Sequence, residues 1–357
     1  MTQCISIHDA KEIEALRREH AVDPHQIARM RMTFCKKLAG REEALDELPA
    51  VSRVAFANRI NFHPLKLEQR LDSKNDGATK LVFVTEAGHR VEAVLLRPAT
   101  GRTALCISSQ VGCAANCDFC ATGKMGFQAN LSAGEILDQI VQAGELIASE
   151  GRRVRNIVLM GMGEPLHNET AVYNAMDALV AGDGFNHPPS RILISTVGIP
   201  DAMLRCARKF PAVNQALSLH SVRQEVREEI IPLAHKYPVS KLRDTMVELN
   251  ALQPGTVMVE YLMLAGLNDS LTDAEELACY LDGLRVHVNL IPYNPIDDAP
   301  HLVGSSREVR DAFANVLKLA GLTTTIRYSM GADIEAACGQ LVQQLDHGLR
   351  GRKKTFV

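Results

Sequence analysis

Tryptophan is absent from this 357-residue chain, and aromatic residues make up only 4% of it. So small an aromatic content argues against a protein that binds nucleic acid by stacking bases on a platform of rings. The chain also has no run of about 20 apolar residues, so no membrane-spanning helix is expected. Its first residues, MTQCISIHDAKEIEALRREH, carry charges where a signal peptide needs an apolar block. We therefore expect a cytoplasmic protein without a membrane partner.

Neither sign of charge dominates, because the net charge is only −3 at pH 7. This balance does not exclude a nucleic-acid partner, since such binding depends on local basic patches. Three basic stretches occur, RMRMTFCKK from residue 29, RRVR from 152 and RGRKK from 350. Each could bind phosphate groups, and each could equally be a solvated surface.

The length favours one large domain with a smaller one beside it. Residues 8–60 have apolar residues at helical spacing, with Gly40 as a candidate helix stop. Residues 79–98 form two β-rich runs around a turn, which predicts a hairpin. We take residues 1–98 as a small accessory domain of helices plus a hairpin.

Short apolar runs alternate with helical patterns from residue 104 onward. The runs are ALCIS at 104, NIVLM at 156, RILIST at 191, QALSL at 215, VMVEYLM at 257, HVNLI at 287 and TTTIR at 323. Alternation of this kind predicts an α/β fold with a parallel sheet, here a full or partial βα barrel of six or seven units. Its active site should lie at the carboxyl ends of the strands. We assign residues 99–346 to this barrel and residues 347–357 to a basic tail.

The stretch CISSQVGCAANCDFC holds four of the nine cysteines. Cys113, Cys117 and Cys120 have the spacing C-x-x-x-C-x-x-C, and Cys106 lies seven positions upstream. In the reducing cytosol such a cluster more often binds metal or does chemistry than forms disulfides. Three thiolates can hold an iron–sulfur cluster. A structural zinc site is the alternative, although zinc normally takes four protein ligands.

The cysteine spacing, placed directly after a strand that opens a βα barrel, resembles the radical SAM superfamily. The resemblance implies a partial (β/α)6 barrel in which Cys113, Cys117 and Cys120 hold one [4Fe-4S] cluster. The open iron would bind S-adenosylmethionine (SAM) through its amino and carboxylate groups. Electron transfer would then cleave SAM to a 5'-deoxyadenosyl radical.

Further short motifs sit at the ends of predicted strands: GMGEP at 161, ISTVG at 194, SLH at 218 and LIPYNP at 290. Glycines let a ligand approach the backbone closely, and Glu164 could accept hydrogen bonds from its amino group. Alone, each polar residue is more often a cap or loop contact. Together they indicate a SAM site made by Gly163, Glu164, Ser195, Ser218, Leu219, His220 and Asn294.

CISSQVGC, the cysteine triad, MGMGEP, SLH, NLIPYNP and DIEAACGQL follow one another in an order that resembles the RlmN/Cfr family of RNA methyltransferases. The resemblance covers nearly all of residues 79–346 and implies methylation of carbon 2 or carbon 8 of an adenosine in 23S ribosomal RNA, with transfer RNA as a further substrate. It implies two SAM molecules per turnover and an electron donor such as flavodoxin or ferredoxin. We expect a monomer.

The same resemblance assigns three more residues. Cys338 would carry the methyl group as S-methylcysteine, Glu92 would be the proton acceptor, and Cys106 would form a transient disulfide with Cys338 that releases the product. Judged alone, Cys338 is more often a small buried apolar residue. The apolar neighbours of Glu92 favour a raised pKa, although an exposed strand glutamate is the alternative. Two alternative functions stay open, another radical SAM enzyme such as a glycyl-radical activase and a non-enzymatic zinc-binding RNA module.

Overall fold

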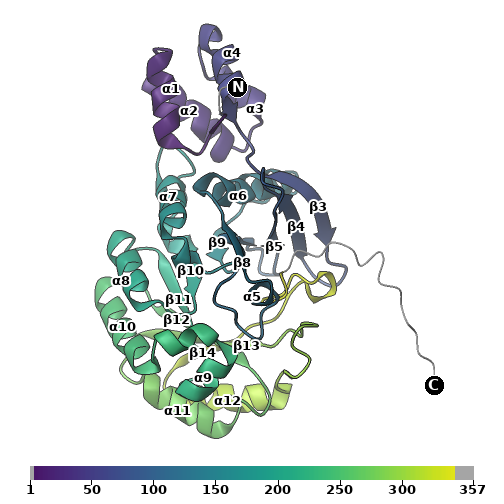
Figure 1. Cartoon of the computed structure of the whole chain (residues 1–357), viewed down its shortest axis with the longest axis vertical. Coiled ribbons are helices and arrows are strands. Elements are labelled where there is room, and N and C mark those ends of the chain that lie inside the picture. The colour runs from purple at the N-terminus through teal and green to yellow at the C-terminus, as the bar shows by residue number, and fades with distance from the viewer. Residues whose placement is uncertain (1–3, 342–357) are drawn as a thin grey trace, which may run out of the picture.

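A computed structural model describes residues 4–341 of the chain. One sheet of ten strands organises these residues, in the order β14-β13-β12-β11-β10-β9-β6-β5-β4-β3 (Figure 1). The strands from β14 to β6 are parallel to their neighbours, whereas β5, β4 and β3 continue the sheet in antiparallel pairing. The predicted tail, 347–357, and its basic run from 350 lie outside the described residues.

All seven predicted barrel strands are present. They are β6 (Ala104–Cys106), β9 (Asn156–Leu159), β10 (Ile192–Thr196), β11 (Asn214–Ser218), β12 (Val257–Met263), β13 (Val286–Pro292) and β14 (Thr323–Ile326). Most of their residues are buried, because helices cover one face and side chains fill the other. This burial explains why the strands are almost continuously apolar in sequence.

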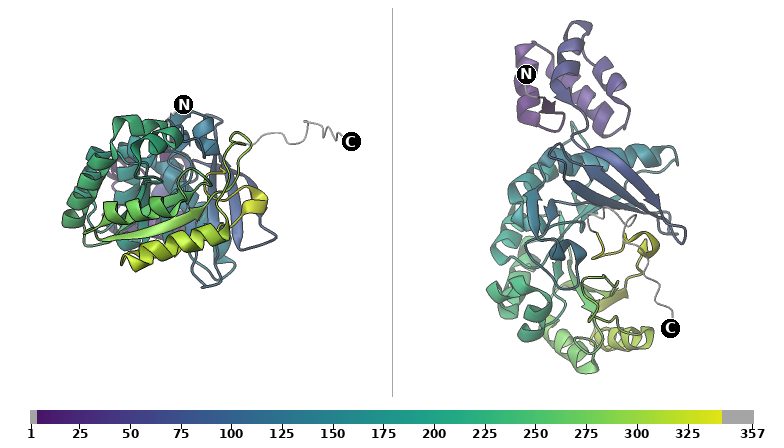
Figure 2. Two further views of the ribbon diagram at one scale, coloured as in Figure 1. Left: turned by 90° about the horizontal axis from the view of Figure 1, so that it is seen from below. Right: turned by 45° about the vertical axis from the view of Figure 1, so that its right-hand side comes forward.

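A helix follows each of the first six strands and packs on the outside of the curved sheet (Figures 1 and 2). These helices are α6 (Ala133–Ala148), α7 (Glu169–Val180), α8 (Pro200–Lys209), α10 (Val239–Leu252), α11 (Leu271–Leu281) and α12 (Arg307–Leu319). Capping boxes begin two of them, with Ser132 and Glu135 at α6 and Ser270 and Asp273 at α11. The prediction of a partial (β/α)6 barrel is confirmed, with β14 as a seventh parallel strand.

Shorter elements lie in the segments that connect these units or follow the last strand. They are β7 (Gln110–Gly112), α5 (Ala121–Lys124), β8 (Phe127–Asn130), η1 (Pro165–His167), η2 (Pro189–Arg191), α9 (Gln224–Ile230), η3 (Pro232–Lys236) and η4 (Ala332–Ile334). The strands β7 and β8 pair with each other in a small antiparallel sheet of their own.

Residues 4–61 form a helical lobe with its own hydrophobic core (Figures 1 and 2). Its elements are β1 (Ile5–Ser6), α1 (Ala10–Glu19), α2 (Pro24–Cys35), α3 (Arg41–Asp46), α4 (Ala50–Arg59) and β2 (Ile60–Asn61). Gly40 does not stop a helix as predicted. The helix α2 ends earlier, Leu38 turns the chain with a left-handed φ of 55°, and Gly40 is the N-cap of α3.

The predicted hairpin is present as β4 (Ala78–Val84) and β5 (Arg90–Leu96), and β3 (Lys66–Asp72) pairs with β4. The strand β5 pairs in turn with the barrel strand β6. The sheet is therefore continuous across residue 98, where the sequence suggested a domain boundary, while the helical lobe has a core of its own. Among residues 4–341, no helix is both long enough and apolar enough to cross a membrane.

Candidate active site

The three clustered cysteines lie on the loop that joins β7 to α5. The backbone N–H of Cys113 donates to Gly126 O at 3.1 Å, which ties the start of the loop to the end of α5. Gly112 has a φ of +73°, and a Cβ there would lie 1.8 Å from Gly126 O. Only glycine fits this position, because both the left-handed backbone and the close approach exclude a side chain.

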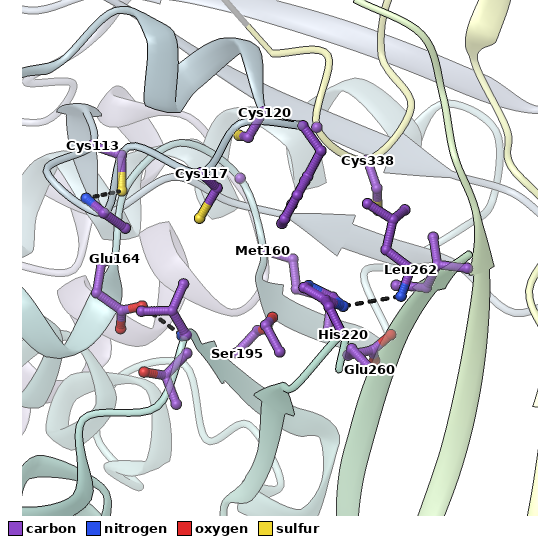
Figure 3. A pocket seen from close by; sticks show the side chains of 18 of the residues that line it. Cys113, Cys117, Cys120, Met160, Glu164, Ser195, His220, Glu260, Leu262 and Cys338 are labelled. Carbon is purple, nitrogen blue, oxygen red and sulfur yellow. Dashed lines mark hydrogen bonds between the residues drawn. The ribbon is translucent and has the colours of Figure 1, made fainter. Parts of the chain in front are cut away.

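A cavity at the carboxyl ends of the barrel strands brings most of the predicted site residues together (Figure 3). It contains about 880 Å³ of space that protein atoms do not fill, including the part open to solvent. The predicted residues in its wall are Cys113, Cys117, Cys120, Gly163, Glu164, Ser195, Ser218, His220 and Cys338.

Cys113 and Cys117 are buried in this cavity, and Cys120 is partly buried. Burial raises the pKa of Cys113 to about 12 and raises the pKa values of Cys117 and Cys120 as well. Thiols in such an environment become thiolates when a metal centre supplies the compensating positive charge. Within residues 4–341, no three His, Cys, Asp or Glu side chains converge closely enough for one metal ion.

Glu164 is buried at the start of η1, opposite the cysteine loop (Figure 3). Its two carboxylate oxygens accept hydrogen bonds from the backbone N–H groups of Leu166 at 3.0 Å and Val197 at 2.8 Å. Burial raises the pKa of Glu164 to about 7, although these two hydrogen bonds oppose the shift. Each oxygen retains a second lone pair, so the carboxylate is oriented and can still accept from a ligand.

His220 and two serines form the neighbouring part of the wall. The N–H of Leu262 donates to His220 Nδ1 at 2.9 Å, and burial lowers the pKa of His220 to about 3. The ring is therefore neutral and carries its proton on Nε2. Its edge meets the Phe119 ring at a centroid distance of 5.0 Å. Ser195 Oγ and Ser218 Oγ lie 3.4 Å apart across adjacent strands.

Two predicted SAM-site residues do not line the cavity. Leu219 is fully buried, and its carbonyl accepts from Arg227 Nε at 3.0 Å. Asn294 donates from Nδ2 to the carbonyl of Cys338 at 3.0 Å. Asn294 thus supports the segment that carries Cys338.

A second cavity, with about 910 Å³ of unfilled space, lies beside the first. Cys106 and Cys338 both line it, and Cys338 and Cys120 belong to the walls of both cavities. All nine cysteines are free thiols, so Cys106 and Cys338 are not joined in this state. Burial raises the pKa of Cys106 to about 12.

Two hydrogen bonds, one from a backbone N–H and one from a side-chain hydroxyl, dock the Cys338 segment beside the cysteine loop. The N–H of Ala121 donates to Gly339 O at 2.8 Å, and Thr122 Oγ1 donates to Leu341 O at 2.6 Å. These two donors directly follow Cys120 in the sequence. Cys338 and the cysteine triad, more than two hundred residues apart, therefore share one site.

Glu92 lies on β5 and is only 2% exposed, which excludes the alternative of an exposed strand glutamate. Its carboxylate lies 3.6 Å from the ammonium of Lys80, and it lines neither cavity. Glu92 and Val94 are two residues apart on β5, so their side chains project to the same face of the sheet. Val94 pairs in register with Cys106, and both residues line the second cavity.

Three polar residues of the cavity walls were missed from the sequence, namely Glu260, Tyr293 and Arg327. Glu260 Oε1 and Tyr293 Oη are buried and have no hydrogen-bond partner among the described residues. Buried polar atoms are normally paired, so these two suit a polar ligand such as SAM. Together with the three thiols they fit the cluster and SAM that the resemblance implies. A glutamate inside the apolar run VMVEYLM was the available signal for Glu260.

No protein-family profile matches the chain. A probable dual-specificity RNA methyltransferase RlmN from Thermus thermophilus is 42% identical over 305 residues, which are 85% of each chain. The ribosomal RNA large subunit methyltransferase Cfr from Staphylococcus aureus is 35% identical over 336 residues, covering 92% of this chain and 95% of Cfr. The chain belongs to the RlmN/Cfr family of radical SAM methyltransferases.

One further relative and one solved structure are similar to this RlmN/Cfr family member over most of its length. A probable RNA methyltransferase from Rhodopirellula baltica is 53% identical over 340 residues, covering 95% of this chain and 88% of the relative. The crystal structure of a radical SAM methyltransferase from Sphaerobacter thermophilus superposes with a TM-score of 0.89 at 36% identity, covering 94% of this chain and 98% of that one. The predicted family and the predicted enzyme class are confirmed. Membership favours the methyltransferase over a glycyl-radical activase or a zinc module.

Proposed function

We propose that this enzyme methylates carbon 2 or carbon 8 of an adenosine in RNA through an S-methylcysteine on Cys338. The supporting observation is that Cys338 lies in the walls of both cavities, beside the cysteine triad in one and beside Cys106 in the other. A methyl carrier needs this position, because it must meet SAM on one side and the target base on the other. By analogy with the named activities of RlmN and Cfr, 23S ribosomal RNA is the first candidate substrate and transfer RNA the second.

Cys113, Cys117 and Cys120 would hold one [4Fe-4S] cluster, which supplies the electron that cleaves SAM to a 5'-deoxyadenosyl radical. Gly163 lies in the cavity wall without a side chain, and glycine is required there because a Cβ would lie 2.5 Å from the Gln110 side chain that packs against it. Glu164, Ser195, Ser218 and His220 offer polar atoms to SAM from the cavity wall. Leu219 and Asn294 would act from behind the wall by holding the strand end and the Cys338 segment. We propose two SAM molecules per turnover, one as methyl donor and one as radical source.

Cys338 would first attack the SAM methyl group through its thiolate. Arg327 lines both cavities, and the neighbouring Cys338 raises the pKa of this guanidinium, so a fixed positive charge accompanies the thiol. The 5'-deoxyadenosyl radical would take one hydrogen atom from the S-methyl group of Cys338, and the methylene radical would add to the ring carbon. Glu92 would accept the ring proton, and the unpaired electron would return to the cluster. Cys106 would then attack the Cys338 sulfur. The sulfur–carbon bond breaks with its electron pair on carbon, a proton completes the methyl group, and a Cys106–Cys338 disulfide remains for external reduction.

The reaction also needs an electron donor, for which flavodoxin or ferredoxin is the candidate, and we propose that a monomer carries it out in the cytoplasm. The target base must leave its stack to enter the second cavity.

Mass spectrometry of RNA nucleosides tests this function. Wild-type holoenzyme with SAM, a reductant and a 23S ribosomal RNA transcript should form 2-methyladenosine or 8-methyladenosine, and the chromatogram distinguishes the two. Cys338→Ala should form neither while it still cleaves SAM. Cys279→Ala, at an exposed cysteine on α11, is the matched control and should react like wild type. Full RNA methylation by Cys338→Ala would contradict the proposal.

A further inference from the structure

Lys80 is a buried lysine that the proposed chemistry does not yet use. It lies on β4 with only 5% of its side chain exposed. Lysine is almost never buried to this extent unless it is paired. Its buried position directly before the apolar run LVFV therefore requires an explanation.

The sheet places Lys80 on the face that carries the proposed catalytic groups. Lys80 pairs in register with Val94, and Val94 pairs in register with Cys106. Residues directly opposite each other across neighbouring strands project to the same face. Glu92 lies two residues from Val94 and shares that face. The ammonium of Lys80 is 3.6 Å from Glu92 Oε1.

Lys80 also reaches the segment that carries the methyl-carrier cysteine. Its ammonium donates to the carbonyl oxygen of Glu335 at 3.3 Å, three residues before Cys338. Glu335 has a left-handed φ of 52°, a backbone conformation that residues other than glycine rarely adopt. The surrounding contacts must hold such a residue in place.

The loop between β3 and β4 forms further hydrogen bonds with the segment that carries Cys338. Ser73 Oγ and the N–H of Lys74 donate to the Asp333 carboxylate at 2.7 and 2.9 Å. The N–H of Gly331 donates to Asp76 Oδ2 at 2.8 Å. The antiparallel extension of the sheet therefore holds one side of the Cys338 segment, while the cysteine loop holds the other.

We infer that Lys80 is a positioning residue that keeps Glu92 ionised and fixes it relative to the Cys338 segment. The inference rests on the proposed function of Glu92 and Cys338. When the ring C–H bond breaks, its proton passes to a Glu92 oxygen and the electron pair of the bond stays in the ring. Lys80 exchanges no proton in this step. Its charge stabilises the carboxylate that must accept the proton, and its hydrogen bond to Glu335 sets where the attached base stands.

Three substitutions separate the charge of Lys80 from its hydrogen bond. Lys80→Arg keeps both, Lys80→Gln keeps a donor without the charge, and Lys80→Met keeps neither. Lys66→Met, at an exposed lysine on β3, is the matched control. Each cluster-loaded protein is incubated with SAM, a reductant and an unmodified 23S ribosomal RNA transcript. Methylated Cys338, covalent protein–RNA adduct and methyladenosine are measured in the same samples.

Methyladenosine should form at rates within about tenfold of one another in the proteins that keep a charged donor at position 80, namely wild type, Lys66→Met and Lys80→Arg. Lys80→Gln and Lys80→Met should methylate Cys338 but accumulate the protein–RNA adduct, with product formation about 100-fold slower, the lower end of what acid–base catalysis supplies. Loss of one member of a buried ion pair is destabilising, so melting temperature and cluster absorbance are measured too. If Lys80→Met does not fold, Lys80→Gln carries the test.

Resolution of the adduct by Lys80→Gln at the wild-type rate would overturn the inference about Lys80 and leave the proposed function intact. The inference would also be overturned if folded Lys80→Arg and Lys80→Gln formed methyladenosine equally slowly, because the charge at position 80 would then have no effect on the rate. Absence of methylated Cys338 from wild-type enzyme would overturn both proposals.

Discussion

A charged side chain inside an apolar strand is a candidate site residue, because its burial costs stability unless a partner or ligand pairs with it. Glu260 stands in the middle of β12, and its Oε2 accepts from Asn289 Nδ2 at 2.8 Å. Its Oε1 is buried in the cavity wall without a partner among the described residues. Burial raises the pKa of Glu260 above its ordinary value. An unpaired buried oxygen is costly, and a ligand N–H or O–H removes that cost.

We expect Glu260→Leu to weaken SAM binding about tenfold, because a hydrogen bond to a charged group contributes roughly 1.5–3 kcal/mol. Glu260→Gln should lose less, since the amide oxygen still accepts. Calorimetric titration of the oxidised holoenzyme with SAM measures this without turnover. Glu225→Leu, at an exposed glutamate of α9, is the control. Equal SAM affinity in Glu260→Leu and wild type would show that Oε1 faces no donor of SAM.

At the scale of single residues, several side chains predicted from the sequence lie together in the wall of one cavity. The cysteine triad, Glu164 and His220 were predicted from spacing and from their positions after strands, and all of them line one cavity. Lys80 and Glu260 were missed, because a single charge in an apolar strand does not show whether it faces a cavity or an ion-pair partner, and Arg327 was missed because it follows the last strand β14 outside any motif. That information comes from the register between strands distant in sequence.

Among the elements, the cysteine loop depends on one glycine. Gly112 and Gly126 both have left-handed φ values, +73° and +69°. A Cβ at Gly112 would overlap Gly126 O, whereas a Cβ at Gly126 would meet nothing within 4 Å. The two positions thus share the same backbone strain and differ only in available space.

Gly112→Ala should therefore disrupt the pairing of β7 with β8 and prevent stable cluster binding. Gly126→Ala should cost only the strain of a left-handed alanine, about 1–2 kcal/mol, and should still bind the cluster. Iron content and absorbance near 400 nm after anaerobic reconstitution measure the difference. Comparable cluster loading in both variants would contradict the role assigned to the space at Gly112.

Element prediction succeeded where burial leaves a strong pattern and failed elsewhere. The barrel strands are buried on both faces and therefore read as apolar runs. The strand β3 was missed because all seven of its residues, KLEQRLD, are exposed and no apolar face distinguishes it. Gly40 was misassigned because glycine serves at either end of a helix, and only the turn at Leu38 decides which.

Across the whole molecule, the helical lobe meets the barrel at a buried carboxylate. Asp138 of α6 accepts from the N–H of Leu65 at 2.9 Å and pairs with His63 Nδ1 at 2.8 Å. Burial alone would lower the pKa of His63, but its hydrogen bond to Asp138 and the nearby charges of Asp138 and Glu145 raise it above 6.5. The ring also lies against Phe34 of the lobe core, at a centroid distance of 5.2 Å.

This arrangement predicts a pH-dependent attachment of the lobe. A group whose pKa is higher in the folded state stabilises it below the unfolded value, here about 6.5, and that contribution disappears as the pH rises through the folded pKa. The melting temperature difference between wild type and His63→Gln should thus be largest at acidic pH and shrink towards pH 9. His25→Gln, at an exposed histidine of α2, should show no such trend. A difference independent of pH would contradict the ion pair.

The docking of residues 339–341 on the cysteine loop has a consequence for how the protein is made. During translation, the three cysteines and the donors on Ala121 and Thr122 are synthesised long before Gly339 and Leu341. The carbonyl groups of those two later residues accept the hydrogen bonds. Until then the backbone N–H of Ala121 and the hydroxyl of Thr122 lack these two partners. Insertion of the proposed iron–sulfur cluster into the finished pocket would accordingly have to follow the synthesis of residue 341.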